Sequence, residues 1–357
     1  MSKITAIEEW QEQTALLLSL PRELGSDWSS DFKEILHSYL ELAKIVCKYQ
    51  KLILVHEPNC KHLEGFRELE NIEFFEFFCD DTWIRDYGPL QVREDNSLLA
   101  LDWRFCGWGK KFCASKDDAF TKAFCQAFGM KYKSLDIELE GGSIDIGRAF
   151  YGESGESGQN SLGKSDAKRQ EGSLLLTTST CLAHENRGSR SMEDLSQTLK
   201  SAFGVDEVLA LDVDPLNGDD TDAHIDTLAR FVAPNTIVYA ALPQSHKEHK
   251  SYESLKRMKT QLEAMAARFK LKLFPLFLPE DIVHEGKTLP ATYLNFIILN
   301  KAVILPIYKD TEADNLALCT LQTLMPERVI EVLDARVFIR QGGSLHCASL
   351  NLYKEKK

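Results

Sequence analysis

The chain has 357 residues, of which 44% are hydrophobic and 27% are charged, a balance that supports a packed core and excludes disorder over the whole length. Its formal net charge of -12 argues against nucleic acid or an anionic membrane surface as a partner, because both carry dense negative charge. The same excess of carboxylates is compatible with a cationic ligand.

The N-terminal residues 1–10 contain no basic segment followed by an apolar run, and no stretch of the chain reaches the roughly 18 apolar residues of a membrane-spanning helix. The nine cysteines form no CxxC pair. Most of them stand in apolar segments, as Cys47 and Cys79 do, which is typical of reduced packing residues. We therefore expect a cytoplasmic protein.

Five segments space their apolar residues as an amphipathic helix does. In the first of them, Phe32, Ile35 and Tyr39 fall on one face. The five predicted helices cover residues 32–49, 119–130, 192–203, 252–269 and 313–325.

Apolar or alternating segments precede and follow these helices and predict strands. They cover residues 14–20, 51–55, 98–105, 173–178, 207–212, 237–242, 271–277, 294–305 and 328–339. The order of strands, helix and strand recurs at intervals of roughly 60 to 85 residues, so the pattern predicts one α/β domain of five loosely repeated modules. Closing the modules into a ring would protect the sheet edges and bring loops from every module to one centre.

Residues 151–172 break this pattern. Glycine, serine and charged residues dominate the segment, so it cannot bury apolar area, and we predict a flexible insertion loop between two strands. It contains a literal phosphate-loop match from Gly158 to Gly163-Lys164-Ser165. That motif binds phosphate where a strand leads into the loop and a helix follows it, and no apolar helical face follows here. The pattern favours a loop over a nucleotide site.

The cysteine with the most informative context is Cys347, in the run 341–347, which reads Gln-Gly-Gly-Ser-Leu-His-Cys. Its glycines allow close approach of the backbone to a ligand. His346 is the adjacent base, but neighbours in an extended segment point to opposite faces. The distant His224 is therefore the expected proton carrier. A thiol, an imidazole and several carboxylates are the groups needed to attack the carbon of a guanidinium ion.

A guanidinium ion keeps its proton and presents a planar set of N–H donors, so its site needs carboxylates in that plane. Asp86 follows Trp83 in a strand-to-turn segment, where the indole could cover a flat cation. The alternative for Asp86 is a turn residue paired with Arg85. Glu140 precedes two glycines, which permit a sharp bend beside a ligand, although a simple turn carboxylate is again the alternative.

His224 and Asp226 are separated by two positions, so on a strand they face the same side and can share one ligand. A purely structural histidine is the alternative for His224. A zinc site made of His224, Asp226 and Cys347 is a further alternative, although the chain lacks close ligand pairs such as CxxC. Asp220 or Asp222, in the acidic run before His224, could bind the far end of a cationic substrate.

Six segments taken together resemble the agmatine deiminase family, which is also the bacterial peptidylarginine deiminase-like group of guanidine-modifying enzymes. They are residues 83–89, 140–143, 181–187, 219–226, 290–295 and 342–347, and they run in order over nearly the whole chain. The resemblance implies a single deiminase domain over residues 1–357, folded as a five-bladed, pseudo-fivefold α/β propeller of ββαβ modules around a central active site. It also implies hydrolysis of agmatine to N-carbamoylputrescine and ammonia through a covalent cysteine thiouronium intermediate, with no metal and no cofactor.

The resemblance assigns a role to each of the residues selected above. Cys347 is similar to the family's nucleophile, His224 to its general acid and base, Glu140 to the carboxylate partner of that histidine, Asp86 and Asp226 to the guanidinium clamps, and Trp83 to a wall of the pocket. Free or peptidyl arginine is the alternative substrate, and a noncatalytic guanidine- or polyamine-binding protein is the alternative class. An exposed face of the ring would allow a homodimer.

Overall fold

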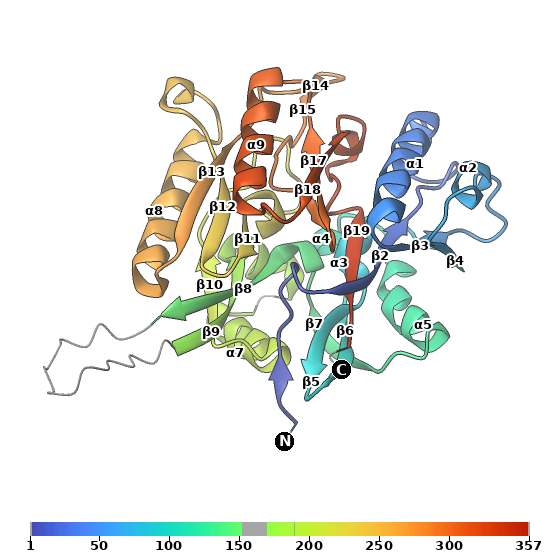
Figure 1. Ribbon diagram of the computed structural model, residues 1–357, viewed down its shortest axis with the longest axis horizontal. Helices are drawn as coiled ribbons and strands as arrows, with labels where there is room; N and C mark the ends of the chain where they lie inside the picture. The colour runs from blue at the N-terminus through green and yellow to red at the C-terminus, as the bar shows by residue number, and fades with distance from the viewer. Residues whose placement is uncertain (1, 152–169, 189, 356–357) are drawn as a thin grey trace, which may run out of the picture.

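The computed structural model describes residues 2–151, 170–188 and 190–355. Its strands form five sheets of three or four strands and one two-stranded hairpin, with helices packed around them (Figure 1). The α/β class predicted from the sequence is therefore confirmed. Among the described residues, no helix has the length and apolar character needed to cross a bilayer.

One connection pattern recurs in four of the sheets: an antiparallel strand pair, then a helix, then a strand parallel to the second strand of the pair. The four modules are β5 (Leu90–Glu94), β6 (Ser97–Arg104), α5 (Phe120–Ala127) and β7 (Tyr132–Glu138); β8 (Ile144–Tyr151), β9 (Gln170–Thr178), α7 (Met192–Phe203) and β10 (Glu207–Leu211); β11 (Ala229–Ala233), β12 (Thr236–Ala241), α8 (Tyr252–Phe269) and β13 (Lys272–Phe277); and β16 (Ile297–Ile298), β17 (Ala302–Ile307), α9 (Thr311–Leu324) and β18 (Val329–Asp334).

The fifth sheet joins the two ends of the chain. Strand β19 (Ser349–Tyr353) pairs antiparallel with β2 (Gln13–Ser19), and β3 (Lys51–His56) and β4 (Ile72–Glu76) continue the sheet in parallel after helix α1 (Phe32–Tyr49). Figure 1 shows β19 in red beside β2 in blue. The C-terminal strand thus completes the N-terminal module, and Cys347 lies two residues before that strand.

The remaining elements are short. They are the strands β1 (Ile4–Thr5), β14 (Val283–His284) and β15 (Lys287–Thr288), the helices α2 (Glu64–Arg67), α3 (Ile84–Tyr87), α4 (Gly107–Lys110) and α6 (Ser179–Leu182), and the 3-10 turns η1 (Asp117–Ala119), η2 (Gly141–Ser143), η3 (Glu185–Arg187), η4 (Ile225–Thr227), η5 (Gln244–His246) and η6 (Phe338–Gln341). Several of them, α3, η2 and η4 above all, carry the polar residues of the site described below.

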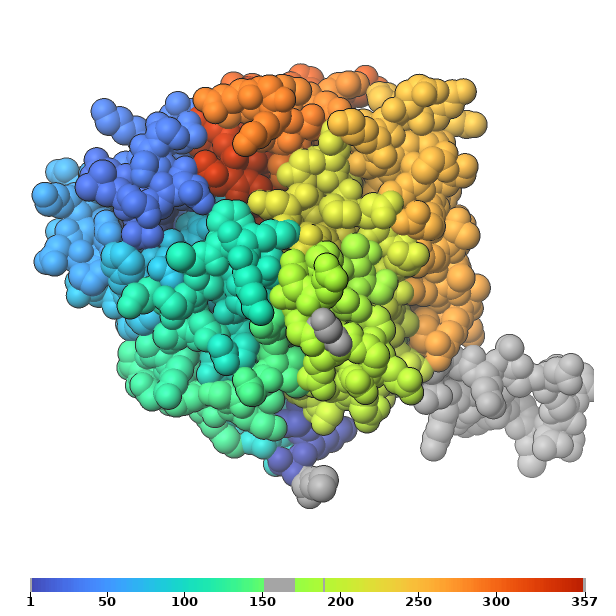
Figure 2. Space-filling view, turned by 180° about the vertical axis from the view of Figure 1, so that it is seen from behind, coloured from blue at the N-terminus to red at the C-terminus, as the bar shows by residue number. Residues whose placement is uncertain are grey.

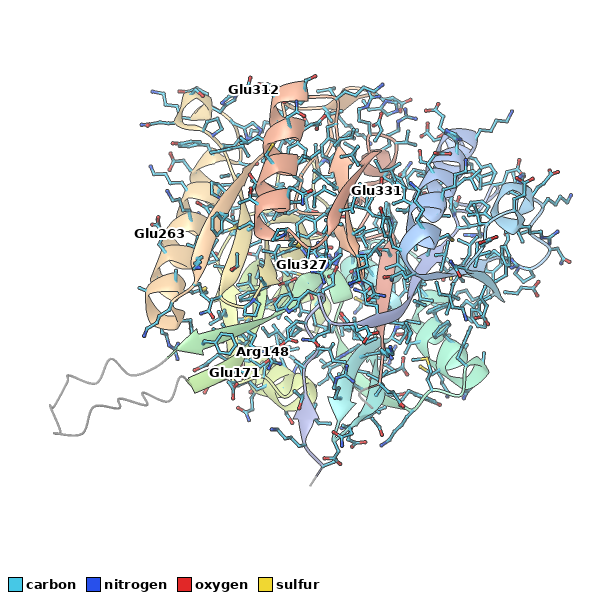
Figure 3. The ribbon with its side chains drawn as sticks, in the orientation of Figure 1. Arg148, Glu171, Glu263, Glu312, Glu327 and Glu331 are labelled. Atoms are coloured by element: carbon cyan, nitrogen blue, oxygen red, sulfur yellow. The ribbon has the colours of Figure 1, made fainter. Side chains whose placement is uncertain are left out.

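The long elements follow from their sequences. Helix α7 begins after Ser191, whose hydroxyl accepts the N–H of Asp194 at 3.2 Å, and ends at Gly204, which adopts the left-handed conformation. Strands β3 and β17 are buried along nearly their whole length, which explains their continuous apolar runs. Glu263 on α8 and Glu312 on α9 project from the outer faces of their helices (Figure 3).

Two strand predictions are wrong. The segment 294–305 is two strands, because the chain turns at Asn300 and the N–H of Leu299 bonds to the carbonyl of Ala302 at 2.8 Å. The segment 328–339 leaves the sheet after Asp334, whose carboxylate accepts the N–H of Arg336 at 3.2 Å. Such a side-chain bond two residues ahead favours a turn over a strand.

The predicted insertion at 151–172 is partly wrong, because Tyr151 ends β8 while residues 170–172 belong to β9. The rest of that segment, including the phosphate-loop match from Gly158 to Ser165, lies outside the described residues. The closed five-bladed ring stays a prediction.

Candidate active site

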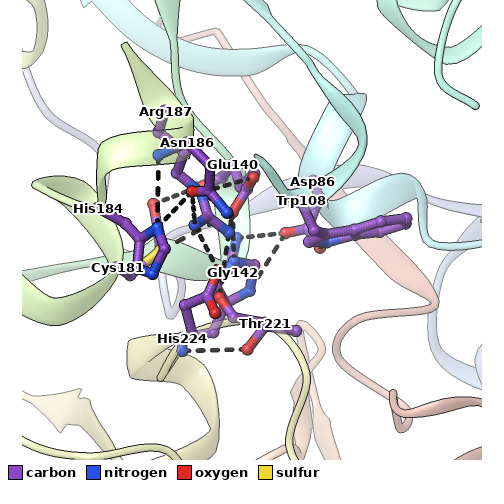
Figure 4. A network of polar contacts seen from close by, with 12 residues as sticks. Asp86, Trp108, Glu140, Gly142, Cys181, His184, Asn186, Arg187, Thr221 and His224 are labelled. Carbon is purple, nitrogen blue, oxygen red and sulfur yellow. Dashed lines mark hydrogen bonds and ion pairs between the residues drawn. The ribbon is translucent and has the colours of Figure 1, made fainter. Parts of the chain in front are cut away.

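A cavity of about 230 Å³ is lined by residues from distant parts of the chain. It brings four residues singled out in the sequence to one place: Trp83, Asp86, Asp220 and Cys347. The other three, Glu140, His224 and Asp226, are buried and contact Asp86 or Cys347 directly or through one another. Figure 4 shows the network around His224.

Asp86 lies in the short helix α3 and has two firm hydrogen bonds. The indole N–H of Trp108 donates to its Oδ2 at 2.9 Å, and the backbone N–H of Gly142 donates to its Oδ1 at 2.7 Å. Burial raises the pKa of Asp86 to about 6, and the neighbouring Glu140 carboxylate adds to this effect. The alternative pairing with Arg85 is wrong, because that guanidinium donates to Asn351 at 2.8 Å and to a backbone carbonyl.

His224 lies between two carboxylates. Its Nε2 is 2.7 Å from Oε2 of Glu140, and its Nδ1 is 3.7 Å from Oδ1 of Asp86. Burial by itself lowers the pKa of this histidine, but the surrounding anionic groups, Asp86 first, raise it well above its usual range. Among the described residues, none forms a hydrogen bond with Nδ1. Gly142 makes this arrangement fit, since a Cβ there would stand 2.6 Å from Nδ1.

Glu140 is held by Arg187 as well as by His224 (Figure 4). The guanidinium of Arg187 donates to Oε1 of Glu140 from Nε and to Oε2 from Nη2, each at 2.9 Å, and its Nη1 donates to Asp222 at 2.7 Å. Burial raises the pKa of Glu140, but the bonds with His224 and Arg187 outweigh it and keep the pKa below its usual range. Glu140 is therefore an anion that stabilises an imidazolium.

Cys347 and Asp226 are joined by Asn295. The amide of Asn295 donates to Sγ of Cys347 and to Oδ2 of Asp226, both at 3.2 Å, while its carbonyl oxygen accepts the N–H of Cys347 at 3.2 Å. The sulfur lies 3.6 Å from Oδ2 of Asp226. Burial and the two carboxylates, Asp226 and Asp86, raise the pKa of the thiol well above its usual range. In the free protein this sulfur is therefore a thiol.

Asp226 presents one bonded and one open oxygen. Its Oδ2 also accepts from Nδ1 of His346 at 2.8 Å, while Oδ1 has no partner among the described residues. Burial raises the pKa of Asp226, but the bond from His346 outweighs this and the pKa is lowered. A buried, anionic oxygen without a donor favours a ligand N–H.

The mouth of the cavity is aromatic and acidic. Trp83 packs against Gly343, where a Cβ would come within 2.5 Å of the indole ring. Asp27, Asp81 and Asp220 also line the cavity. Burial raises the pKa of Asp81 to about 6, with added repulsion from Asp27 and Asp220. A cation between them would relieve that repulsion.

Two local predictions about these residues are wrong. His224 and Asp226 do not lie on a strand: His224 precedes the 3-10 turn η4, and Asp226 is inside it. The turn forms because Oγ1 of Thr221 accepts the N–H of His224 at 3.2 Å and the hydroxyl of Thr227 returns to its carbonyl at 2.8 Å. The segment with His346 and Cys347 is also a turn and not extended. His346 nevertheless contacts Asp226 and Glu9.

Sequence reasoning gave no role to four residues of the site: Trp108, Cys181, Arg187 and Asn295. Three of them stand in the segments that carried the family resemblance. Trp108 had a different signal, since it stands between two glycines and adopts a left-handed backbone conformation with φ 51°. Such strain in a bulky residue is found mostly where function requires it.

The zinc alternative is not reproduced in the form stated above. The ligand atoms that lie within 4.8 Å of one another belong to Glu140, Cys181 and His224, without Asp226 or Cys347. Both oxygens of Glu140 already accept from Arg187. A metal ion there would have to compete with a buried guanidinium for the same carboxylate.

Comparison with known proteins agrees with this geometry. The sequence profile of the family described as Porphyromonas-type peptidyl-arginine deiminase matches residues 5–148 and 168–352. The substrate-bound structure of a cysteine-to-serine variant of C. jejuni agmatine deiminase is 37% identical, has a TM-score of 0.87, and covers 99% of this chain and 97% of its own.

Two further structures extend the comparison. Another structure of C. jejuni agmatine deiminase is 36% identical, with a TM-score of 0.85, and covers 99% of this chain and 98% of its own. The agmatine deiminase of Enterococcus faecalis has a TM-score of 0.83 at 24% identity and covers 99% of this chain and 97% of its own. At that identity the likeness concerns the fold.

Proposed function

Because the chain belongs to the Porphyromonas-type peptidyl-arginine deiminase family, we propose that it hydrolyses agmatine to N-carbamoylputrescine and ammonia through a covalent adduct on Cys347. One observation carries the proposal: Cys347 and Asp86 line one cavity, and the sulfur lies 3.6 Å from Asp226, whose second oxygen has no partner within the described part of the chain. A guanidinium held by that oxygen would place its carbon close to the sulfur.

Recognition of the cation rests on two buried carboxylates and on aromatic rings. Asp86 and Asp226 supply negative charge for the planar N–H donors of a guanidinium. Trp83 and Trp108 line the same cavity, and aromatic faces attract flat cations. In this proposal Asp226 receives N–H donors on Oδ1, since Oδ2 is already bonded.

The chemical step needs a thiolate, and the bound cation helps to form it. A positive charge beside Cys347 opposes the effect of the two carboxylates and lowers the pKa of the thiol on binding. The sulfur then attacks the guanidinium carbon, a C–S bond forms, and the C=N electron pair moves to nitrogen. The thiol proton leaves to solvent. The imidazolium of His224 protonates one nitrogen, the C–N bond breaks, ammonia leaves, His224 becomes neutral, and ammonia takes up one proton in solution to give the ammonium ion.

Water completes the cycle. His224, now neutral, takes a proton from water as the oxygen attacks the thiouronium carbon. The C–S bond breaks, the thiol regains a proton, and the carbonyl of the urea product forms. Across both steps one guanidinium and one water give one urea group and one ammonium ion, so atoms and charge balance. Glu140 stabilises the imidazolium of His224 before the first proton transfer and again after the second.

The acidic mouth favours agmatine over arginine. Agmatine ends in an ammonium group, whereas arginine carries a carboxylate beside its amine. Asp27, Asp81 and Asp220 line the cavity together with Lys287 and Arg340, and Arg340 is already paired with Asp31 and Glu34. The carboxylates of the three lining aspartates attract the first group and repel the second. Asp220 keeps the role expected from the sequence, as part of this acidic mouth.

The experiment is a side-by-side assay of ammonia release from agmatine, free arginine and a peptidyl-arginine substrate. We expect many equivalents of ammonia per protein from agmatine and at least about tenfold lower kcat/KM for the other two, because one unfavourable charge contact costs more than 1.4 kcal/mol. Faster release from peptidyl arginine would transfer the assignment to that substrate. Tight binding without release would indicate a guanidine-binding protein.

We also propose that the five sheets close into a five-bladed propeller around this cavity. Two observations support the closure: β19 pairs with β2 across the chain ends, and successive parts of the chain follow one another around the face seen in Figure 2, with red segments next to blue ones.

A further inference from the structure

His346 connects Asp226 to a second buried carboxylate, Glu9. Its Nδ1 is 2.8 Å from Oδ2 of Asp226, and its Nε2 is 2.8 Å from Oε2 of Glu9. All three side chains are buried, and Asp226 is fully so. The chemical step proposed above makes no use of His346 or Glu9.

Glu9 is itself fixed from two sides. Its Oε2 accepts from Nη2 of Arg230 at 2.6 Å, and its Oε1 accepts the backbone N–H of Ile298 at 3.2 Å. Arg230 is fully buried, and its Nε lies 3.5 Å from Asp145. Glu9 thus contacts one end of the imidazole while Arg230 and Ile298 hold its carboxylate, and a carboxylate with this many partners has little freedom to rotate.

Arg230 extends the same network to the segment around Asn295. Its Nη1 donates to the carbonyl of Leu294 at 3.1 Å and to the carbonyl of Phe296. These residues flank Asn295, whose amide donates to Sγ of Cys347 and to Asp226. The segment that holds the sulfur and the imidazole that holds Asp226 therefore share one buried support.

The orientation of Asp226 decides what its second oxygen can do. Oδ2 is occupied by His346 and Asn295, which leaves Oδ1 as the open acceptor. Without the imidazole donor, the carboxylate could rotate and exchange its two oxygens. A planar guanidinium needs an acceptor in its own plane, so a rotated Asp226 carboxylate would bind the cation less tightly.

We infer that His346 is a positioning residue that orients Asp226 for the guanidinium, with Glu9 as its anchor. The inference rests on the proposed function, since the guanidinium is the cation that the function supplies. Because Asp226 is an anion that accepts, the proton that matters is the one on Nδ1 of His346. The far nitrogen keeps the ring in place by donating its own proton to Glu9, because a carboxylate oxygen can only accept.

Two substitutions of His346 distinguish the role of Nδ1, which faces Asp226, from that of Nε2, which faces Glu9. In His346→Asn the amide nitrogen can stand near the position of Nδ1 and still donate to Asp226, whereas in His346→Gln it reaches toward Nε2 and Glu9. We expect KM for agmatine to stay within about threefold in His346→Asn and to rise at least about tenfold in His346→Gln, with smaller changes in kcat.

Glu9→Gln tests the anchor, and Glu8→Gln is its matched control. Glu8 is also buried and is adjacent in sequence, but it pairs with Arg148 and not with His346. We expect a higher KM in Glu9→Gln and an unchanged KM in Glu8→Gln. Thermal unfolding of each variant, and calorimetric binding of agmatine to the same variants in a Cys347→Ser background, separate loss of positioning from loss of fold.

The possible results lead to distinct conclusions. If KM for agmatine stayed at the wild-type value in both folded variants, His346→Asn and His346→Gln, the inference would be overturned. An equal rise of KM in both would also overturn it and would indicate that His346 acts through packing alone. If the two His346 variants do not fold, the Glu9 and Glu8 pair decides by the same criterion. If the wild-type protein releases no ammonia, the proposed function fails, and calorimetric binding then decides the positioning role by itself.

Discussion

The site contains two buried histidines, each between two carboxylates, and they differ in one respect. His346 has both ring nitrogens at 2.8 Å from a carboxylate oxygen. His224 has one nitrogen 2.7 Å from Glu140, while the other lies 3.7 Å from Asp86 and has no hydrogen bond within the described part of the chain. The first ring is fixed at both ends, and the second keeps one end available.

The difference indicates which histidine can move a proton. A general acid must be able to exchange partners during the reaction, whereas a ring bound at both nitrogens serves best as a support. Its position next to the cysteine would favour His346, but the sequence pattern already indicated His224 as the proton carrier. The distribution of partners, and not the distance along the chain, separates the two roles.

The largest expected effect comes from Cys347, the proposed nucleophile. Cys347→Ser should reduce kcat for agmatine by about 10⁴-fold or more, because an alcohol without a strong base is a far weaker nucleophile than a thiolate. Binding of agmatine, measured by calorimetry, should persist. Turnover near the wild-type rate would contradict the covalent step.

The variant His224→Gln tests the difference between the two histidines most directly. The amide can still bond to Glu140 but cannot transfer a proton, so kcat should fall by about 10² to 10⁴-fold with little change in agmatine binding. In His346→Gln we expect the opposite: KM for agmatine should rise and kcat should change less. If both variants lost kcat equally, the contrast between an acid–base residue and a support would be wrong.

The pH dependence of kcat/KM should report on Asp86, the carboxylate that faces the open nitrogen of His224. Its pKa of about 6 in the free protein predicts that kcat/KM for agmatine falls up to about tenfold per pH unit below pH 6, as the protonated carboxyl loses its attraction for the cation. Bound agmatine lowers that pKa, so kcat should fall at a lower pH than kcat/KM does. Steady-state profiles from pH 5 to 8 measure both.

The raised pKa of Asp86 also makes the stability of the folded protein depend on pH, in a direction that can be stated. Because the folded-state pKa of Asp86 lies above the ordinary value of 3.8, its contribution to stability is present below about pH 4 and is lost as the pH rises through about 6. Acidification from pH 7 to pH 5 should therefore reduce kcat/KM without destabilisation from this group. Profiles of activity and of thermal unfolding that fell together would contradict the assignment.

The smallest expected effect is that of metal removal. Incubation with a chelator followed by assay should leave kcat for agmatine unchanged, because Arg187 already neutralises Glu140 beside His224. A loss of activity that added zinc restores would indicate that Glu140, Cys181 and His224 hold a metal ion.

The long amphipathic helices were predictable from sequence because their apolar spacing is local information. Helix α8 has the predicted bounds of residues 252–269. Strands β8 and β11 were not predicted. Strand β11 begins directly after the turn that carries Asp226. Their pairing with other strands depends on contacts that no local pattern contains.

The site was predictable in part for the same reason. Cys347, Asp86 and Glu140 stand beside glycines or turn residues that mark them in the sequence. Asn295 and Arg187 have ordinary surroundings, and their importance lies in bonds to residues 52 and 47 positions away. Glu9 is an extreme case, since it contacts His346 across 337 positions.

The pairing of β19 with β2 places a condition on synthesis of the protein. Cys347 reaches the cavity from the segment just before β19, and that strand pairs with β2, which is synthesised much earlier than β19. A nascent chain on the ribosome therefore cannot act on its substrate until residue 353 has emerged and docked. Activity therefore depends on docking of β19 and not only on the local turn that carries Cys347.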